Sequence, residues 1–159
     1  MTVQLNVLFV CTGNICRSPT AEYVLRCKAL ARGWSDEKLN IASAGTNPWS
    51  RGRGADSRSA AAARSRGYDL SEHVARPVEP EDFQIFEYIL CMDSANVEIM
   101  ENIRPRGFAG TLKLFLEYGS EGGPREVPDP YVGEAGFERV LDLIEEASEG
   151  FLATFGSGA

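Results

Sequence analysis

The sequence contains a single histidine, His73, among its 159 residues, and its four cysteines include no Cys-x-x-Cys pair. Structural zinc sites need several cysteine and histidine ligands at short spacings, so the sequence does not predict a zinc site. No other pattern implies a bound metal or an organic cofactor, and we expect none.

Long apolar runs are also missing. The stretch MTVQLNVLFVC has no basic residue, and its apolar part is too short for a signal peptide or a membrane span. We therefore expect a cytoplasmic protein whose cysteines stay reduced.

Positive charge is scarce as well, because the formal net charge is −7. This balance argues against nucleic acid or an anionic membrane as the main partner.

The sequence has no repeat, no low-complexity tract and no internal linker. It predicts one domain over residues 1–159, with the last few residues as a loose tail. Apolar stretches typical of buried strands alternate with segments typical of helices. The expected strands cover residues 4–11, 39–45, 83–93 and 110–119, and the expected helices cover residues 18–33, 56–70, 94–105 and 137–151. This alternation predicts an α/β fold with a parallel sheet and helices on both faces.

The segment CTGNICR connects the first expected strand to the first expected helix, with five residues between Cys11 and Arg17. Backbone N–H groups at such a position can surround an anion. Gly13 and Asn14 tolerate the dihedral angles that a tight curl requires. Arg17 can hold a phosphate group through two parallel hydrogen bonds. The segment therefore predicts a phosphate-binding loop.

Cys11 would lie at the bottom of this loop. The surrounding amides, the helix dipole and Arg17 all favour its thiolate form, and Ser18 could add a hydroxyl donor. A thiolate held in line with a phosphorus atom is a nucleophile for phosphoryl transfer through a cysteinyl-phosphate.

Such a displacement needs an acid to protonate the leaving group. Asp129 lies between two prolines in the segment VPDPYV, in a loop before the last expected helix. Asp93 is a rival, but its position between a strand and a helix is typical of a helix N-cap. We therefore expect Asp129 to donate a proton to the leaving group and later to accept one from water.

The segments VLFVCTGNICRSPTAE and DPY, with SAGT, GYDLSEHVAR and FEYILCMD between them in the expected order, identify a known pattern. In these segments the sequence resembles the low-molecular-weight protein tyrosine phosphatases. The resemblance implies a four-stranded, doubly wound parallel sheet. It also implies Cys11 as nucleophile, Arg17 as phosphate clamp and Asp129 as general acid and then base. The phosphate-binding amides would come from Thr12, Gly13, Asn14, Ile15, Cys16 and Arg17.

The same resemblance implies a network that supports the loop, formed by Asn14, Ser18, Ser43 and His73. In this role His73 holds the loop and is not the base. Taken by itself, without the resemblance, His73 would be interpreted as a surface histidine or a satisfied core histidine.

Two aromatic residues, Trp49 and Tyr131, are candidate walls of a deep slot that favours phosphotyrosine over the shorter phosphoserine. Trp49 could instead anchor its loop. Relatives specific for phosphoarginine tend to carry threonine at the position of Ile15, so the apolar residue favours tyrosine. The expected partners are phosphotyrosine proteins, and the expected oligomeric state is a monomer.

Two further features are left open. Arg51, Arg53 and Arg58 make a basic rim in an acidic protein, and they either select acidic peptides or are simply solvated. Cys16 lies five positions after Cys11, so oxidised Cys11 could be trapped as a reversible disulfide.

Two other functions compete with tyrosine phosphatase activity. A thiol-dependent arsenate reductase uses a similar cysteine loop but needs further cysteines to relay a disulfide, and no cysteine follows Cys91. A non-catalytic phosphate- or phosphotyrosine-binding module would have no need to keep Cys11, Arg17 and Asp129 together.

Overall fold

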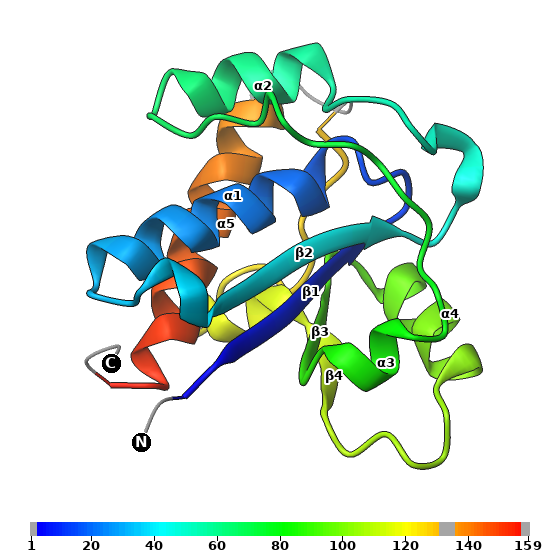
Figure 1. Ribbon diagram of the computed structural model, residues 1–159. Coiled ribbons are helices and arrows are strands. Elements are labelled where there is room, and N and C mark those ends of the chain that lie inside the picture. The colour runs from blue at the N-terminus through cyan, green and yellow to red at the C-terminus, as the bar shows by residue number, and fades with distance from the viewer. Residues whose placement is uncertain (1–2, 131–135, 157–159) are drawn as a thin grey trace.

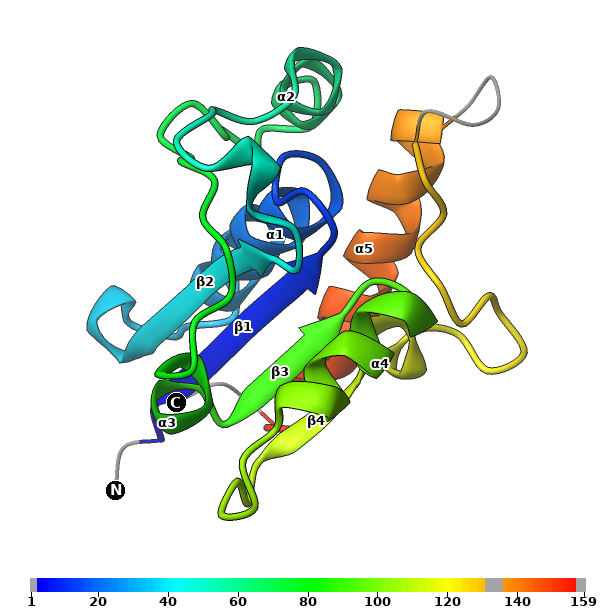
Figure 2. The ribbon, with the colours of Figure 1, turned by 90° about the vertical axis from the view of Figure 1, so that its right-hand side faces the viewer.

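The computed structural model describes residues 3–130 and 136–156. Four strands form an all-parallel sheet in the order β2–β1–β3–β4 (Figures 1 and 2). The strands are β1 (Leu5–Cys11), β2 (Leu39–Gly45), β3 (Tyr88–Cys91) and β4 (Thr111–Leu114). The strand order changes direction at β1, so the expected doubly wound parallel sheet is confirmed.

Different helices cover the two faces of the sheet (Figure 1). One face packs against α1 (Arg17–Ala31) and α5 (Gly136–Ala153), and α2 (Ser57–Arg64) packs on these two helices. The other packs against α3 (Asp82–Ile85) and α4 (Ser94–Ile103). Short 3₁₀ turns are η1 (Asp36–Lys38), η2 (Pro48–Ser50) and η3 (Phe115–Tyr118). No helix within the described residues is long and apolar enough to cross a membrane.

In the central strand β1, apolar residues do not alternate with polar ones, because both faces of the strand are buried. Leu5, Val7 and Phe9 belong to the core cluster on the α1 and α5 side. Leu8 and Val10 belong to the cluster on the α3 and α4 side. Successive side chains of a strand point to opposite faces, and both faces of this strand are covered. Each large apolar side chain buried in this way contributes about 1.5–3 kcal/mol.

The prediction of one strand over residues 83–93 is wrong at its beginning. The chain first forms α3, and pairing with β1 starts only at Tyr88. Phe83 and Phe86 are three positions apart, so one helical turn directs both rings into the same core cluster. The buried carboxylate of Asp82 fixes the start of this turn, because it accepts hydrogen bonds from a backbone amide and from an arginine. A short amphipathic turn was thus mistaken for a buried strand.

The strand predicted over residues 110–119 is also shorter, because β4 ends at Leu114 and η3 follows. Phe115 turns into the core, where its ring meets the Phe9 ring edge-on at a centroid distance of 4.7 Å. The four predicted helices are all present, and Asp56 caps α2 as its position suggests. The prediction for α2 is wrong at its end, because the helix stops at Arg64 and not at residue 70.

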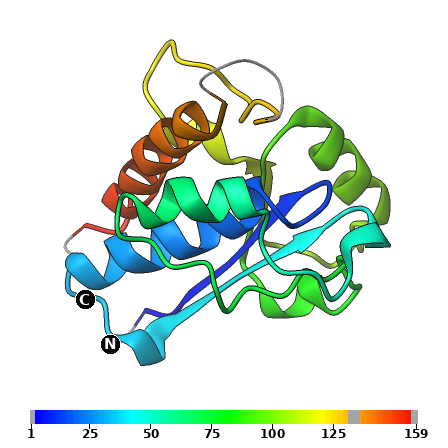
Figure 3. The same ribbon diagram turned by 90° about the horizontal axis from the view of Figure 1, so that it is seen from above.

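The carboxyl ends of parallel strands meet at one edge of the sheet, where ligands bind in folds of this class. The loop after β1 lies at this edge, beside the segment that follows β2 (Figure 3). The segment at 125–130 reaches the same edge, because the Val127 amide donates a hydrogen bond to the Met92 carbonyl just after β3.

Candidate active site

The loop from Cys11 to Arg17 surrounds a cavity of about 170 Å³ at this edge. Since β1 ends at Cys11 and α1 begins at Arg17, the loop is the direct connection from strand to helix. Asp129 and Pro130 complete the lining, opposite six of the seven loop residues: Cys11, Thr12, Gly13, Ile15, Cys16 and Arg17. The structure therefore brings the predicted nucleophile, phosphate clamp and acid to one cavity.

Asn14 is the loop residue that faces away from the cavity, and it is buried in the supporting structure. Its φ of 58° lies in the left-handed region, which non-glycine residues rarely adopt. Its backbone carbonyl accepts a hydrogen bond of 2.6 Å from Nε2 of His73. Its side-chain Oδ1 accepts a hydrogen bond of 2.9 Å from the backbone amide of Arg76. The unusual backbone conformation is thus held from two sides.

The orientation of the Asn14 amide sets the direction of the remaining hydrogen bonds. Because Oδ1 accepts from Arg76, Nδ2 donates to Oγ of Ser18 and to Oγ of Ser43, each at 2.9 Å. Ser18 keeps its own hydrogen for Sγ of Cys11, which is 2.9 Å away. The Asn14 backbone amide also donates to this sulfur, at 3.2 Å. Two donors thus point at the sulfur of the predicted nucleophile.

The same series of hydrogen bonds continues to Glu22, which sequence reasoning missed. Oγ of Ser43 donates to Oε1 of Glu22 at 2.6 Å. Burial raises the pKa of Glu22, while the Ser43 hydrogen bond and the charges of Arg26 and Arg76 act in the opposite direction. One signal could have found this residue. Glu22 lies four positions after Ser18 on α1 and therefore on the same side of the helix.

Arg17 is held by groups from two distant segments. Its Nη1 donates to Oδ2 of Asp93 at 2.7 Å and to the Val127 carbonyl at 3.1 Å. Asp93 also caps α4, since its Oδ1 accepts from the Asn96 amide at 2.9 Å. The prediction of a helix cap at Asp93 is confirmed. Its ion pair with Arg17 was missed, because 76 positions separate the two residues and no local pattern connects them.

The two predicted aromatic walls have different outcomes. Trp49 lies on η2 and its side chain is 88% exposed, so it does not anchor its loop by packing. Its ring is not part of the lining that the described residues form around the cavity. Tyr131 lies outside the described residues. Cys11 and Cys16 are both buried in the same lining and are not joined to each other, so their disulfide stays a prediction.

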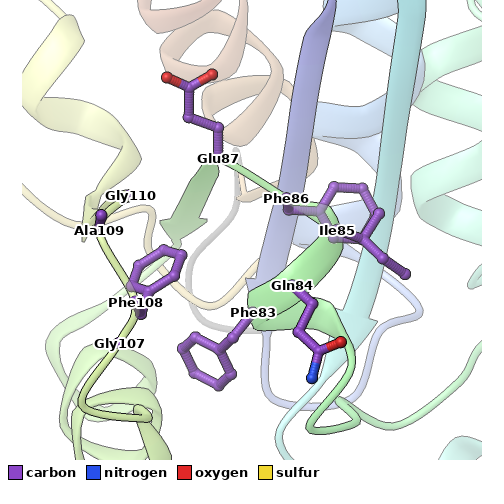
Figure 4. Close-up of a pocket in the computed structure, with 9 residues that line it drawn as sticks. All are labelled: Phe83, Gln84, Ile85, Phe86, Glu87, Gly107, Phe108, Ala109 and Gly110. Carbon is purple, nitrogen blue, oxygen red and sulfur yellow. The ribbon is translucent and has the colours of Figure 1, made fainter.

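A larger cavity, of about 320 Å³, lies at the opposite edge of the sheet, beside the starts of β3 and β4 (Figure 4). Phe83 and Phe108 line it from facing segments. Glu87 is the one ionisable residue in that lining, and there is no nucleophile. The groups suited to phosphoryl transfer therefore gather at the smaller cavity.

Comparisons with known proteins agree with this geometry. A family model described as low molecular weight phosphotyrosine protein phosphatase matches residues 6–158. A protein of that description from Schizosaccharomyces pombe is 38% identical over 153 residues, covering 96% of this chain and 97% of the relative. The crystal structure of a protein tyrosine phosphatase from Entamoeba histolytica matches with a TM-score of 0.88 and 37% identity, covering 98% and 99% of the two chains. The Drosophila arginine phosphatase matches with a TM-score of 0.88 and 29% identity, covering 96% and 98%.

Proposed function

This chain belongs to the low molecular weight phosphotyrosine protein phosphatase family, and we propose that it hydrolyses phosphotyrosine through a covalent intermediate on Cys11. One observation carries the assignment of the residues. Sγ of Cys11 accepts hydrogen bonds from two donors at the bottom of a cavity that Asp129 and Arg17 also line. A nucleophile, an acid and a phosphate clamp are thus available to one bound phosphate group.

In the first step, the Cys11 thiolate attacks phosphorus in line with the leaving oxygen. The S–P bond forms as the P–O bond to the tyrosine ring breaks, and Asp129 donates its proton to the departing oxygen. The amides of residues 12–17 and the Arg17 guanidinium stabilise the charge on the three equatorial oxygens.

In the second step, water attacks the phosphorus of the cysteinyl-phosphate. Asp129, now a carboxylate, takes a proton from this water, and Cys11 leaves as a thiolate. Inorganic phosphate is released and the enzyme returns to its initial state. Asn14 and Ser18 donate hydrogen bonds that stabilise the leaving sulfur.

The proposed substrates are phosphotyrosine residues of cytoplasmic proteins, on which the chain acts as a monomer. An apolar Ile15 in the cavity lining supports an aromatic substrate over phosphoarginine. Arsenate reduction is less well supported. Cys91, the cysteine considered for its disulfide relay, is fully buried and burial raises its pKa.

Hydrolysis of p-nitrophenyl phosphate from pH 4 to 8, without added metal, tests the proposal directly. We expect Cys11→Ser to abolish activity and Asp129→Asn to lower kcat by about 10²–10⁴-fold, the range of a lost general acid. Phosphate release from phosphotyrosine and phosphoarginine peptides then distinguishes the two substrate classes. A folded, reduced wild-type protein without activity would overturn the proposal, and arsenate turnover would be measured next.

A further inference from the structure

Positive charge is concentrated in one part of this acidic chain. Residues 39–68 contain five arginines and a single acidic residue, whereas the whole chain has a net charge of −7. The five arginines are Arg51, Arg53, Arg58, Arg64 and Arg66, and the acidic residue is Asp56. An acidic ligand would be repelled by most of the molecule and attracted to this segment.

The backbone fixes part of this segment directly beside the candidate active site. After β2, the amides of Thr46 and Asn47 donate hydrogen bonds of 2.9 and 3.0 Å to the carbonyls of Cys11 and Thr12. Ten residues later, the Asp56 amide donates a hydrogen bond of 2.8 Å to the Ile15 carbonyl in the same loop. Residues 47–56 are therefore attached to the phosphate-binding loop at both ends (Figure 3).

The backbone between these attachments is held as well. The Gly52 amide donates to the Ala75 carbonyl, and the Ala75 amide donates to the Arg53 carbonyl, each at 2.8 Å. Side chains at these positions thus extend from an ordered backbone.

The arginines near the cavity differ from those elsewhere in how they are paired. Arg66, just after the C-terminal end of α2, is partly buried and lies within 2.9 Å of three carboxylates on α5. Arg51 is 68% exposed and only reaches Glu79 at 4.0 Å. Arg53 is exposed, and no described residue forms an ion pair with its guanidinium. Arg58 is exposed but touches Asp56 and the Phe137 ring.

Trp49 adds a second, independent observation. Its indole is almost entirely exposed, on η2 and only two residues from Arg51. Large exposed aromatic rings rimmed by charge are typical of protein-binding surfaces. An extended peptide whose phosphotyrosine occupies the cavity would lie against this ring.

We propose that Trp49, Arg51 and Arg53 form a docking surface for acidic residues that flank the phosphotyrosine of a protein substrate. This inference rests on the proposed function, because it concerns the substrate that the same cavity accepts. The surface selects acidic phosphotyrosine sequences over neutral ones, although the protein as a whole is acidic. The nearby carboxylates of Asp56 and Glu79 do not cancel the positive charge of this surface. Glu79 lies 4.0 Å from Arg51, at the distance limit of an ion pair, and Asp56 pairs with Arg58.

Two phosphotyrosine peptides that differ only in glutamate or glutamine beside the phosphotyrosine test this surface. Exposed ion pairs are each worth about two- to fivefold, so the wild-type protein should favour the glutamate peptide by about fivefold or more in kcat/KM at low salt. At about 1 M salt the Debye length falls to about 3 Å, and we expect the preference to disappear.

The variant Arg51→Glu/Arg53→Glu should lose the preference or reverse it in favour of the glutamine peptide. The matched control is Arg104→Glu/Arg106→Glu, which makes the same charge change between α4 and β4, at the opposite edge of the sheet. We expect the control to retain the wild-type ratio. Circular dichroism and thermal unfolding establish that both variants are folded.

The outcomes separate the two proposals. A wild-type protein that hydrolyses both peptides equally at low salt would overturn the docking surface and leave the phosphatase activity intact. An equal loss of preference in both double variants would also overturn the docking surface, because the preference would then depend on the net charge of the protein and not on the position of the two arginines. A wild-type protein that hydrolyses neither peptide nor p-nitrophenyl phosphate would instead contradict the proposed function.

Discussion

At the scale of single residues, the candidate site depends on the direction of its hydrogen bonds. Asn14 donates through Nδ2 on two sides, to Ser18 and to Ser43. Ser18 donates a hydrogen bond to Cys11, and Ser43 donates one to Glu22. Every donated hydrogen in this series has one acceptor, and the series ends at the sulfur of Cys11 and at the carboxyl group of Glu22. Glu22 therefore acts on Cys11 through three other side chains, as a positioning residue.

Replacing Glu22 separates this role from simple packing. Glu22→Ala leaves the Ser43 hydroxyl without its acceptor, so we expect a loss of about 1–3 kcal/mol in the free energy of unfolding. Ser43 can then turn its hydrogen toward Asn14, which disturbs the donors to Cys11. At a fixed pH of about 6, alkylation of Cys11 by iodoacetamide should become slower, and kcat/KM should fall. Glu22→Gln keeps an oxygen acceptor and should retain an alkylation rate near that of the wild type. Equal alkylation rates in all three proteins would contradict the role.

The pKa of Glu22 gives the same comparison a pH dependence. Burial raises this pKa in the folded protein above the ordinary value of 4.5. Between 4.5 and the raised value, the folded state binds more protons than the unfolded state, so stability falls as pH rises. Glu22→Gln does not titrate. In urea unfolding, the wild type should therefore lose stability relative to Glu22→Gln as pH rises from 4.5. A difference that stays constant with pH would show that burial does not govern this carboxyl group.

The sequence predicts a site residue when the residue belongs to a short local pattern, and it does not predict contacts between residues that are far apart along the chain. Cys11 and Arg17 belong to one short loop, and Asp129 lies in a distinctive proline-flanked turn, so a local pattern indicates each of them. The contacts of Asp93 with Arg17 and of Ser43 with Glu22 join segments that only the folded sheet brings together. No local pattern could have assigned those partners.

At the scale of elements, the connection after β1 takes its shape from the end of β2. Gly45 pairs with Cys11 in the sheet and lies directly under the loop. A Cβ atom at Gly45 would be 2.7 Å from the Thr12 carbonyl oxygen and 3.2 Å from the Asn14 backbone nitrogen. The end of β2 therefore has room for the phosphate-binding loop only without a side chain.

Gly45→Ala should accordingly shift the loop. We expect a loss of about 1–3 kcal/mol in the free energy of unfolding, which is the usual cost of overpacking. Because the displaced atoms carry the loop amides, kcat/KM for p-nitrophenyl phosphate should fall as well. Gly54→Ala is a matched control, since its Cβ would meet no atom closer than the His73 carbonyl at 3.8 Å. Its stability should stay within about 0.5 kcal/mol of the wild type. Similar behaviour of the two variants in urea unfolding would show that close packing at Gly45 does not shape the loop.

Sequence patterns predicted most elements because hydrophobic periodicity and helix caps are local. The helix capped by Asp56 and the strand ending at Cys11 are examples. The pattern failed at α3, where four residues are too few to show a helical period. It also failed at the end of β4, where Phe115 continues an apolar run but packs against Phe9 as part of a 3₁₀ turn.

At the scale of the whole molecule, opposite charges attach the last helix to the rest of the fold. Glu149 of α5 accepts hydrogen bonds from Lys28 of α1 and from Arg32, directly after α1, at 3.0 and 2.9 Å. Near the other end of α5, Arg66 pairs with three carboxylates: Glu138, Asp142 and Glu145. Of the arginines in residues 39–68, Arg66 thus joins helices, whereas Arg51 and Arg53 remain exposed beside the candidate active site.

This division predicts a salt-dependent contribution of Arg66 to stability. Arg66→Met keeps most of the side chain's apolar contact and removes its three ion pairs. At low salt we expect a loss of about 1 kcal/mol in the free energy of unfolding, because the pairs are partly exposed. At about 1 M salt the pairs are screened, so the wild type and the variant should converge. Arg106→Met, at an exposed arginine for which the described residues provide no ion pair, should match the wild type at both salt concentrations. A gap between wild type and Arg66→Met that is as large at high salt as at low salt would mean that Arg66 joins α2 to α5 by packing and not by charge.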